Sequence, residues 1–377
     1  MPLSASELER YSRHVLLAEV GRAGQEKLRA ARVLIVGAGG LGSPAAFYLA
    51  ASGVGTLGII DGDLVQLSNL QRQILFGVTD VGQPKAVVAS RRLRELNPDI
   101  SVVAHALELS ANNVGAVVGS YDLVVDATDR PAVRYLVNDV CVILRKPLVS
   151  AAIHRFEGYA ITYLPGRGAC FRCLFPDSTA GGVVNCADAG VLGVLPGVLG
   201  TIQATEVIKV ILGQGEPLAG RLLTYDALDL AFREFPVSRR PDCAVCGDTP
   251  TIATLEDVAS RASTTSVALR RLTPTELAAL IQGAPRGSSP IRLIDVREPA
   301  EFAAGHLANA ESIPLDQLER DATALPDTGM TVFICRSGAR SLRACAIAQR
   351  RGIREPAHLE GGLAAWAAVV DPSLHVA

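Results

Sequence analysis

The N-terminal part of the chain alternates between short apolar runs and longer stretches in which apolar residues recur at helical spacing. The apolar runs predict strands at residues 33–36, 57–61, 101–105, 122–126 and 147–150. The helical patterns predict helices at residues 43–52, 83–96 and 131–145. This alternation is typical of an α/β domain with a mostly parallel sheet and helices on both faces. Ligands bind to such sheets beyond the carboxyl ends of the strands, where we expect the functional site.

A glycine-rich turn follows the first predicted strand, with the spacing G-x-G-x-x-G. Gly37 permits a tight turn, Gly39 lets the backbone approach a phosphate, and Gly42 lets the next helix pack closely on the strand. The second strand ends at Asp61, about 20 residues downstream, where a carboxylate is placed to bind ribose hydroxyls. The order of strand, glycine turn, helix and acid predicts a nucleotide site. A glycine turn without a ligand is the alternative interpretation.

Two basic residues follow near the same edge of the predicted sheet. Arg72 lies in a polar stretch without clear periodicity, and Lys85 stands in the first turn of the next predicted helix. A helix N-terminus favours anions, so a lysine there is better explained if Arg72 and Lys85 share a phosphate. Two surface cations are the alternative. The turn Asp126–Asp129 follows the fourth strand and adds carboxylates at this edge.

The cysteines offer further chemistry. Cys170 with Cys173, and Cys243 with Cys246, form two C-x-x-C pairs that together predict a structural zinc site of four thiolates. A redox role for one pair is the alternative. Cys186 belongs to neither pair and lies in a polar, glycine-bounded loop, so it is either a candidate nucleophile or an inert bystander.

Composition narrows the class of protein. The length of 377 residues allows two domains, and a net charge of -2 with 49% hydrophobic residues describes an ordinary soluble protein. The charge pattern predicts neither nucleic-acid binding nor attachment to a membrane. The apolar stretch Gly190–Gly213 is interrupted by Gln203 and Glu206, which favours a buried helix over a membrane span. The first residues lack the pattern of a secretory signal peptide, so we expect a cytoplasmic location and reduced cysteines.

A change in composition after Cys246 separates the first α/β pattern from a second one. Residues 1–259 form the predicted first domain, small polar residues in 260–271 predict a flexible linker, and 272–377 form the predicted second domain. In the second domain, a predicted strand runs directly into Cys335–Arg340 and then a helix. Backbone N–H groups at the helix N-terminus and two arginines would stabilise an anionic sulfur at Cys335. A buried core cysteine is the alternative.

These motifs resemble two known families in tandem. Residues 5–258 resemble the ubiquitin-activating-like adenylyltransferases that charge small sulfur-carrier proteins in molybdopterin, thiamine and related pathways. That resemblance rests on Gly37–Gly42, Asp61, Ser68–Gln73, Gly82–Lys85, Thr128–Asp129 and the two C-x-x-C pairs. Residues 272–377 resemble a single rhodanese domain, through Asp295–Glu298, Glu301–Leu307, Cys335–Arg340 and Glu360–Trp366. The predicted fold is a Rossmann-like ubiquitin-activating-type adenylation domain with structural zinc, followed by a smaller α/β rhodanese domain.

The resemblance implies a site for ATP and Mg²⁺. Asp61 would hold the ribose, and Asp129 would bind or orient Mg²⁺. The phosphates would be surrounded by Asn69, Arg72 and Lys85. The further nucleotide contacts that it implies are Gly39, Gly40, Gly42, Ser68, Leu70, Gln71 and Arg130. Arg130 stands where the family usually has asparagine, and Arg13 would reach the ATP from the other subunit of a homodimer.

The resemblance also implies a reaction. ATP would adenylate the C-terminal glycine of a ubiquitin-like carrier that ends in Gly-Gly, with Arg72 and Lys85 as catalytic residues. A persulfide on Cys335 would then displace AMP, and Cys186 would help to release the carrier as a thiocarboxylate. A cysteine desulfurase or thiosulfate would supply the sulfur. Two alternatives stay open: a nicotinamide-dependent oxidoreductase that uses the same glycine turn, and a non-catalytic rhodanese docking module.

Overall fold

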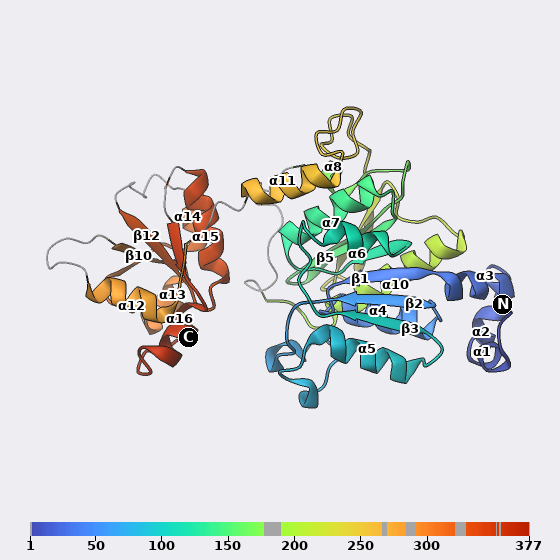
Figure 1. Ribbon diagram of the computed structural model, residues 1–377, viewed down its shortest axis with the longest axis horizontal. Coiled ribbons are helices and arrows are strands. Elements are labelled where there is room, and N and C mark those ends of the chain that lie inside the picture. The colour runs from blue at the N-terminus through green and yellow to red at the C-terminus, as the bar shows by residue number, and fades with distance from the viewer. Residues whose placement is uncertain are drawn as a thin grey trace. The chain divides into compact units, whose positions relative to one another are not determined.

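The computed structural model describes residues 2–176, 190–265, 270–283, 291–320, 329–351, 353 and 356–376. The chain forms two compact units, Met1–Ala262 and Ser263–Ala377 (Figure 1). The predicted domain limits at 259 and 272 stay predictions, but the predicted flexible linker is wrong in part. Residues 260–265 continue α11 (Leu255–Thr265), and residues 270–272 form β9 (Arg270–Leu272). At the N-terminus of this helix, the Thr254 hydroxyl accepts the N–H of Asp257. The positive end of the helix dipole also favours the two acidic residues of the first turn, Glu256 and Asp257.

An eight-stranded sheet organises the first unit, in the order β3-β2-β1-β4-β5-β6-β7-β8. Its parallel strands are β1 (Arg32–Val36), β2 (Thr56–Ile60), β3 (Ser101–His105), β4 (Leu123–Asp126) and β5 (Leu148–His154). These are the five strands that the apolar runs predict. The antiparallel strands are β6 (Glu157–Tyr163), β7 (Arg221–Asp226) and β8 (Ala231–Pro236). The turn between β5 and β6 is too short for a crossover helix, so the sheet continues there as hairpins.

Helices cover both faces of this sheet. One core joins strand residues such as Val33 and Ile35 to α3, α4, α5 and α10, and the other joins Leu34 and Val36 to α6 and α7. Figure 1 shows α6 and α7 on one side of the strands, and α4 and α5 on the other. The helical elements of this unit are α1 (Ala5–Arg10), α2 (Ser12–Val15), α3 (Gly21–Ala30), α4 (Gly42–Ala51), η1 (Leu67–Asn69), η2 (Val78–Asp80), α5 (Lys85–Leu96), α6 (Val114–Gly119), α7 (Pro131–Ile143), α8 (Phe171–Leu174) and α10 (Leu195–Leu212).

The apolar helix α10 is a core helix of the first unit. By length and composition alone it is one helix that could cross a membrane, and half of it is buried inside the unit. It packs on α4, β5 and β6. Its buried Gln203 donates to the carbonyl of Asp126, and its buried Glu206 accepts from Thr162. These polar contacts explain the residues that interrupt the apolar stretch, and the predicted buried helix is confirmed.

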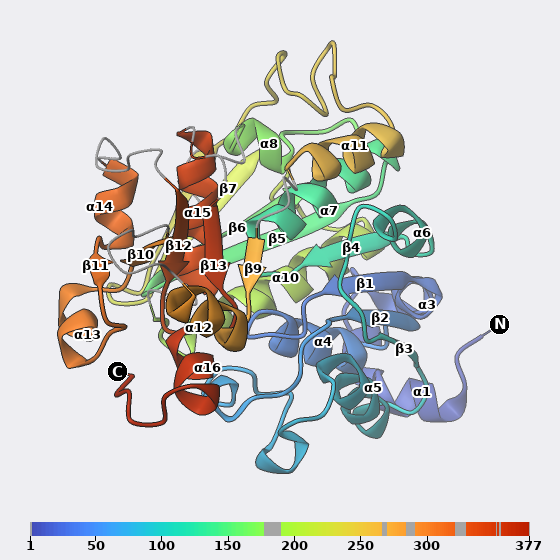
Figure 2. The ribbon, with the colours of Figure 1, turned by 60° about the vertical axis from the view of Figure 1, so that its left-hand side comes forward.

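The second unit is built on a parallel sheet in the order β11-β10-β12-β13-β9. Its other strands are β10 (Ile291–Asp295), β11 (Ala310–Ser312), β12 (Met330–Ile334) and β13 (Pro356–Leu359). Its helices are α12 (Pro274–Gln282), α13 (Pro299–Ala304), α14 (Leu315–Arg320), α15 (Ala339–Arg350) and α16 (Gly362–Val369). Figure 2 shows α15 and α14 on one side of β12 and β13, and α12 and α16 on the other. The end of β12 opens directly into the loop that carries Cys335.

Candidate functional site

The glycine turn after β1 has the geometry that its spacing predicts. Gly37 has a φ of 94°, and a Cβ there would stand 2.8 Å from the carbonyl oxygen of Ala127. A Cβ on Gly42 would stand 1.9 Å from the carbonyl oxygen of Gly37, at the start of α4. The tight turn at Gly37 and the close packing at Gly42 are therefore confirmed.

A cavity of about 1070 Å³, open solvent included, lies beyond the carboxyl ends of β1, β2 and β4. Seven of the predicted nucleotide contacts line it: Gly39, Gly40, Asp61, Arg72, Lys85, Asp129 and Arg130. The other predicted contacts, all within the described residues, lie outside its lining: Gly42, Ser68, Asn69, Leu70, Gln71 and Arg13. Arg13 is exposed on α2. The cavity is the crevice that the strand order predicts, and its ligand contacts stay predictions.

A carboxylate and a lysine face each other inside this cavity. Asp61 accepts the N–H groups of Ala38 and Asp63, both at 2.8 Å. Burial raises the pKa of Asp61, although the charge of Lys85 opposes this shift. The Lys85 ammonium lies 2.9 Å from the Asp63 carboxylate, and the lysine side chain is only 6% exposed. Lys85 is therefore not a surface cation. Its ion pair with Asp63 keeps the lysine ammonium at the cavity wall.

Arg72 and Arg130 reach the cavity with different partners. The Arg72 guanidinium donates to the Ser68 carbonyl at 3.3 Å. Arg130, the departure from the family pattern, pairs with Glu108 at 3.0 Å. Asp129 beside it is exposed. The Arg130 side chain is thus held by a carboxylate that comes from the segment after β3.

Sequence reasoning missed two polar residues of the cavity wall as site residues. Gln73 is 5% exposed, and among the described residues its Oε1 has no hydrogen-bond partner. Its amide nitrogen lies 3.7 Å from where a Cβ on Gly39 would stand. An unpaired buried acceptor is costly, so this atom is suited to a ligand or a water molecule. The signal was present in the sequence, because Gln73 directly follows Arg72 in the same polar stretch.

Arg134 is the second missed residue, and it ties the turn that carries Asp129 to the sheet. Its buried guanidinium donates to the carbonyl of Thr128 at 2.6 Å and to that of Ala151 at 2.9 Å. It also lies 3.2 Å from the fully buried Asp126 carboxylate, whose pKa is raised by burial while Arg134 opposes the shift. Nothing in the sequence indicates this role, since Arg134 stands within the apolar pattern of a helix.

The four cysteines of the two C-x-x-C pairs come together on the α7 side of the sheet. Their sulfur atoms all lie within 4.8 Å of one another, with Cys170 to Cys243 at 3.6 Å and Cys173 to Cys246 at 3.3 Å. The hydrogen bond with Cys170 lowers the pKa of Cys173. A tetrahedral ion with four thiolates requires sulfur separations of about 3.8 Å, so this cluster fits a metal ion. Cys186 lies outside the described residues.

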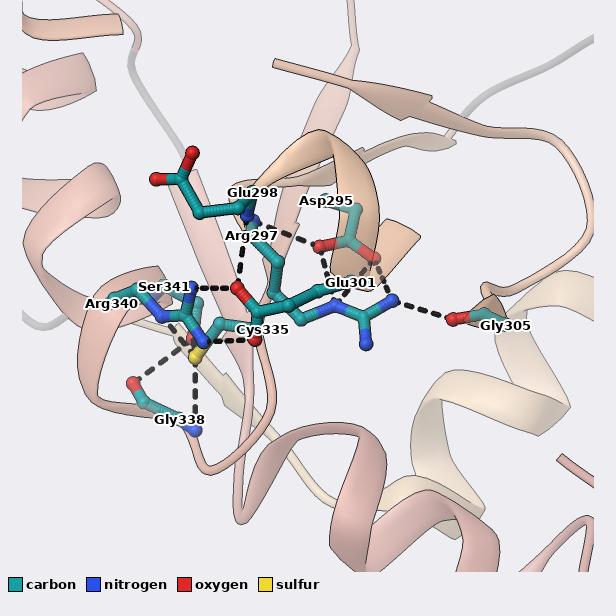
Figure 3. A network of polar contacts seen from close by, with 9 residues as sticks. All are labelled: Asp295, Arg297, Glu298, Glu301, Gly305, Cys335, Gly338, Arg340 and Ser341. Atoms are coloured by element: carbon teal, nitrogen blue, oxygen red, sulfur yellow. Dashed lines mark hydrogen bonds and ion pairs between the residues drawn. The ribbon is translucent and has the colours of Figure 1, made fainter. Parts of the chain in front are cut away.

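Cys335 sits in a cradle of backbone N–H groups at the start of α15 (Figure 3). Its sulfur accepts the N–H of Gly338 at 3.1 Å and that of Ser341 at 3.4 Å. Gly338 has a φ of 98°, which turns its N–H toward the sulfur. Cys335 is buried, as the alternative interpretation predicted, but these donors distinguish it from a core cysteine such as Cys345. The predicted cradle is confirmed for its backbone donors.

The two arginines predicted beside the sulfur behave differently. Arg336 is exposed, whereas Arg340 forms a bidentate pair with Glu301 on α13 at 2.6 and 2.7 Å. The Arg340 guanidinium is paired with Glu301, and stabilisation of the sulfur by the two arginines stays a prediction. Asp295 neutralises Arg297 in the same network.

Comparison with known proteins agrees with this geometry. The sequence matches the ThiF family over residues 11–245 and the rhodanese-like domain over residues 273–369. It is 40% identical to the adenylyltransferase and sulfurtransferase MOCS3 of Aedes aegypti, over 99% of this chain and 90% of the relative. It is 50% identical to a sulfur carrier protein adenylyltransferase of Thermus thermophilus, over 68% of this chain and 97% of the relative.

The first unit also resembles solved structures. The structure of E. coli MccB with ATP has a TM-score of 0.58 and 29% identity, over 65% of this chain and 75% of that one. The probable adenylyltransferase/sulfurtransferase MoeZ of Mycobacterium tuberculosis is 40% identical over 99% of this chain and 96% of its own length. The chain therefore belongs to the ThiF family. A rhodanese-like domain follows the ThiF domain in the sequence, in the arrangement of the fused adenylyltransferase and sulfurtransferase enzymes.

Proposed function

We propose that this enzyme activates the C-terminal glycine of a ubiquitin-like sulfur-carrier protein with ATP and then replaces one carboxylate oxygen with sulfur. The observation that carries the proposal is the presence, in one chain, of a cavity lined by Arg72 and Lys85 and of a cradled thiol at Cys335. A nicotinamide-dependent oxidoreductase needs neither feature. The relatives named as adenylyltransferases do not favour that alternative or a docking role.

In the first step, the glycine carboxylate attacks the α-phosphorus of ATP and pyrophosphate leaves. Arg72 and Lys85 neutralise charge on the phosphates, and Asp61 accepts hydrogen bonds from the ribose. The backbone at Gly39 and Gly40 gives the phosphates close access to the N-terminus of α4. Adenylation uses ATP with a divalent metal; we infer Mg²⁺, which Asp129 would hold and which would neutralise phosphate charge.

In the second step, the outer sulfur of a Cys335 persulfide attacks the acyl carbon of the adenylate and AMP leaves. The product is an acyl disulfide that links the carrier to Cys335. The Cys186 thiolate then attacks the Cys335 sulfur, which releases the carrier thiocarboxylate and leaves a Cys335–Cys186 disulfide. A cellular dithiol must reduce that disulfide before the next cycle.

The four-cysteine cluster has a structural role in this proposal. We infer that it holds Zn²⁺, since four thiolates on two C-x-x-C turns form a closed tetrahedral site with no position left for a substrate. The ion would fix α8 against the segment around Cys243, which is far away in sequence. We also propose a homodimer in which Arg13 reaches the partner's nucleotide, and a cytoplasmic location.

The test is a direct one on the full chain. Each candidate ubiquitin-like protein ending in Gly-Gly is incubated with the enzyme, ATP, Mg²⁺ and a sulfur donor. We expect pyrophosphate release and a carrier mass that changes by the exchange of one oxygen for one sulfur. A carrier truncated by its last two glycines is the control and should give neither signal. Intact ATP with every carrier that is offered would overturn the proposal.

A further inference from the structure

The N-terminus of α16 lies against the loop that carries Cys335. The N–H of Leu363 donates to the Cys335 carbonyl at 2.8 Å, and the N–H of Ala364 donates to the Arg336 carbonyl at 3.0 Å. Both N–H groups belong to the first turn of α16, where no carbonyl of the helix itself can accept them. The residue at the N-cap is Gly361, which has no side chain to cap them. The loop and the helix therefore satisfy each other's backbone groups.

Gly362 makes this close approach possible. Its φ is 62°, and a Cβ there would stand 2.4 Å from the carbonyl oxygen of Cys335 and 2.5 Å from that of Arg336. Leu363 and Trp366 hold the other side of α16, since both side chains are buried in the apolar core beneath the helix. A side chain at Gly362 would thus displace the two loop carbonyls, because the helix is anchored in the core.

The two held carbonyls also set the direction of the next two N–H groups. The peptide bonds of the loop are trans, and a trans peptide group points its C=O and its N–H in opposite directions. The N–H groups of Arg336 and Ser337 share their peptide groups with these carbonyls, so they point away from α16. Neither N–H has an acceptor among the residues that the structure describes. The Cys335 sulfur itself takes the N–H groups of Gly338 and Ser341.

We propose that the first turn of α16 is a positioning element for sulfur transfer, with Gly362 as its positioning residue. By holding the carbonyls of Cys335 and Arg336, it directs the N–H groups of Arg336 and Ser337 at the outer sulfur of a loaded Cys335. The helix itself does not touch the sulfur and acts only through the loop backbone.

The inference rests on the proposed sulfur-transfer function and deepens it. In the loading step, the Cys335 thiolate attacks the outer sulfur of a donor R–S–SH, the S–S bond of the donor breaks, and the thiolate R–S⁻ leaves. The sulfur added to Cys335 is an anion once its proton has left. Oriented N–H donors stabilise the negative charge that develops there, so their direction affects the rate of loading.

The first test removes one N–H of α16 at an exposed position. Ala364→Pro deletes the donor to the Arg336 carbonyl, and the first turn of a helix tolerates proline because its N–H groups have no partner within the helix. Ala364→Ser keeps the N–H and is the matched control. Loading from cysteine persulfide is followed on the full chain by the mass of the added sulfur, at increasing concentrations of this donor.

We expect the maximal rate of loading to fall by about tenfold in Ala364→Pro, because the peptide group after Arg336 is no longer aligned. The half-saturating concentration of cysteine persulfide should not change, since α16 does not contact the donor. Ala364→Ser should load as the parent chain does. A purely structural role would lower the unfolding temperature without lowering the maximal rate of the folded protein.

Gly362→Ala tests the same contact from the other side. Its Cβ would displace both carbonyls, so we expect a larger fall in the maximal rate of loading, of about 10²-fold. Gly213→Ala is the control for backbone strain, because Gly213 has a φ of 68° and a Cβ there would meet no atom of the described residues within 4 Å. Gly213→Ala should not change the loading rate. Thermal unfolding checks that each variant is folded, and pyrophosphate exchange should continue in all of them.

The outcomes separate this inference from the proposed function. If folded Ala364→Pro or Gly362→Ala protein loads at the rate of the parent chain, or if Ala364→Ser loses as much as Ala364→Pro, the role of α16 is overturned while sulfur transfer stands. If mass spectrometry finds no added sulfur on Cys335 of the parent chain, sulfur transfer itself is overturned, and the inference with it.

Discussion

The nucleotide cavity and the Cys335 cradle use the same backbone device for different ligands. Each lies where a buried parallel strand ends, turns through a glycine of positive φ and enters a helix, with a φ of 94° at Gly37 and 98° at Gly338. Such a turn points backbone N–H groups at whatever lies before the helix. The shared backbone therefore does not decide the chemistry of the two sites.

The side chains make the difference between the two regions. In the cavity, the Gln73 Oε1 has no partner among the described residues, and Asp129 is exposed. In the cradle, Glu301 occupies Arg340 and the sulfur takes the N–H groups of Gly338 and Ser341. A site for a polyanion with a metal needs available donors and acceptors, whereas a site for a single sulfur functions with backbone donors alone. The following predictions test this contrast.

The largest expected effect comes from Cys335→Ala, which removes the sulfur nucleophile but leaves the cavity intact. We expect carrier-dependent exchange of pyrophosphate into ATP to continue, because adenylation needs only the first unit. Thiocarboxylate formation should fall to background in the mass spectrum of the carrier. Cys345→Ala, at a buried cysteine of the same core, is the control and should still give thiocarboxylate. Loss of exchange in a folded Cys335→Ala protein would contradict this division of work.

Lys85→Met should have the opposite effect, by disabling the cavity. The substitution removes a buried cation that lies beside Asp61 and Asp63, where phosphates would bind. We expect the exchange rate to fall by roughly 10²–10³-fold, the range for loss of one preorganised charge in an active site. Cyanide-dependent removal of sulfur from preloaded Cys335 should not change. Lys27→Gln, whose ammonium binds the Leu212 carbonyl outside the cavity, is the matched control; an equal loss of exchange there would contradict the assignment.

The sequence predicted best those features that depend on local chemistry. Apolar runs identified five strands, and glycine spacing identified the turn whose close contact at Gly42 leaves no room for a Cβ. Cysteine spacing identified four sulfurs that meet although the second pair lies far downstream of the first. Each of these patterns has few other structural interpretations, so a single sequence was enough to predict the strands, the turn and the cysteine cluster.

Features set by tertiary contacts were not predictable in the same way. The sequence shows Arg340 as a cation beside Cys335, but its partner Glu301 comes from another element, 39 residues earlier. Arg134 appears as an ordinary helical residue until the carbonyls of Thr128 and Ala151 are brought to it. The small polar residues from Ser260 resemble a linker, yet a helix that starts at Leu255 continues to Thr265. Charge pairing and helix propagation depend on neighbours that spacing does not reveal.

A smaller effect is expected from Arg134→Lys. Lysine keeps the positive charge. Its single ammonium cannot reproduce the fork with which the guanidinium donates to the carbonyls of Thr128 and Ala151 and also pairs with Asp126. The turn that carries Asp129 should lose its fixed position, so KM for ATP should rise by roughly five- to tenfold, with a smaller change in kcat. Arg172→Lys is the control, because Arg172 pairs with Asp139 farther along α7. A similar loss of stability in both variants, with KM raised only in Arg134→Lys, would support a positioning role; an unchanged KM would contradict it.

The smallest effect concerns the pH dependence of nucleoside binding. Burial raises the pKa of Asp61 above the usual value of about 3.9, so its carboxylate is protonated at a higher pH than that of an exposed aspartate. The protonated form loses acceptor capacity for the ribose, and affinity should therefore fall as the pH decreases through this raised pKa. Adenosine is the best probe, since it has no phosphate that titrates in the same range. Asp61→Asn should bind adenosine more weakly near neutral pH and lack the acidic decline, as measured by calorimetry. If Asp61→Asn shows the same decline as the parent chain, another group causes it, and Asp61 does not control ribose binding.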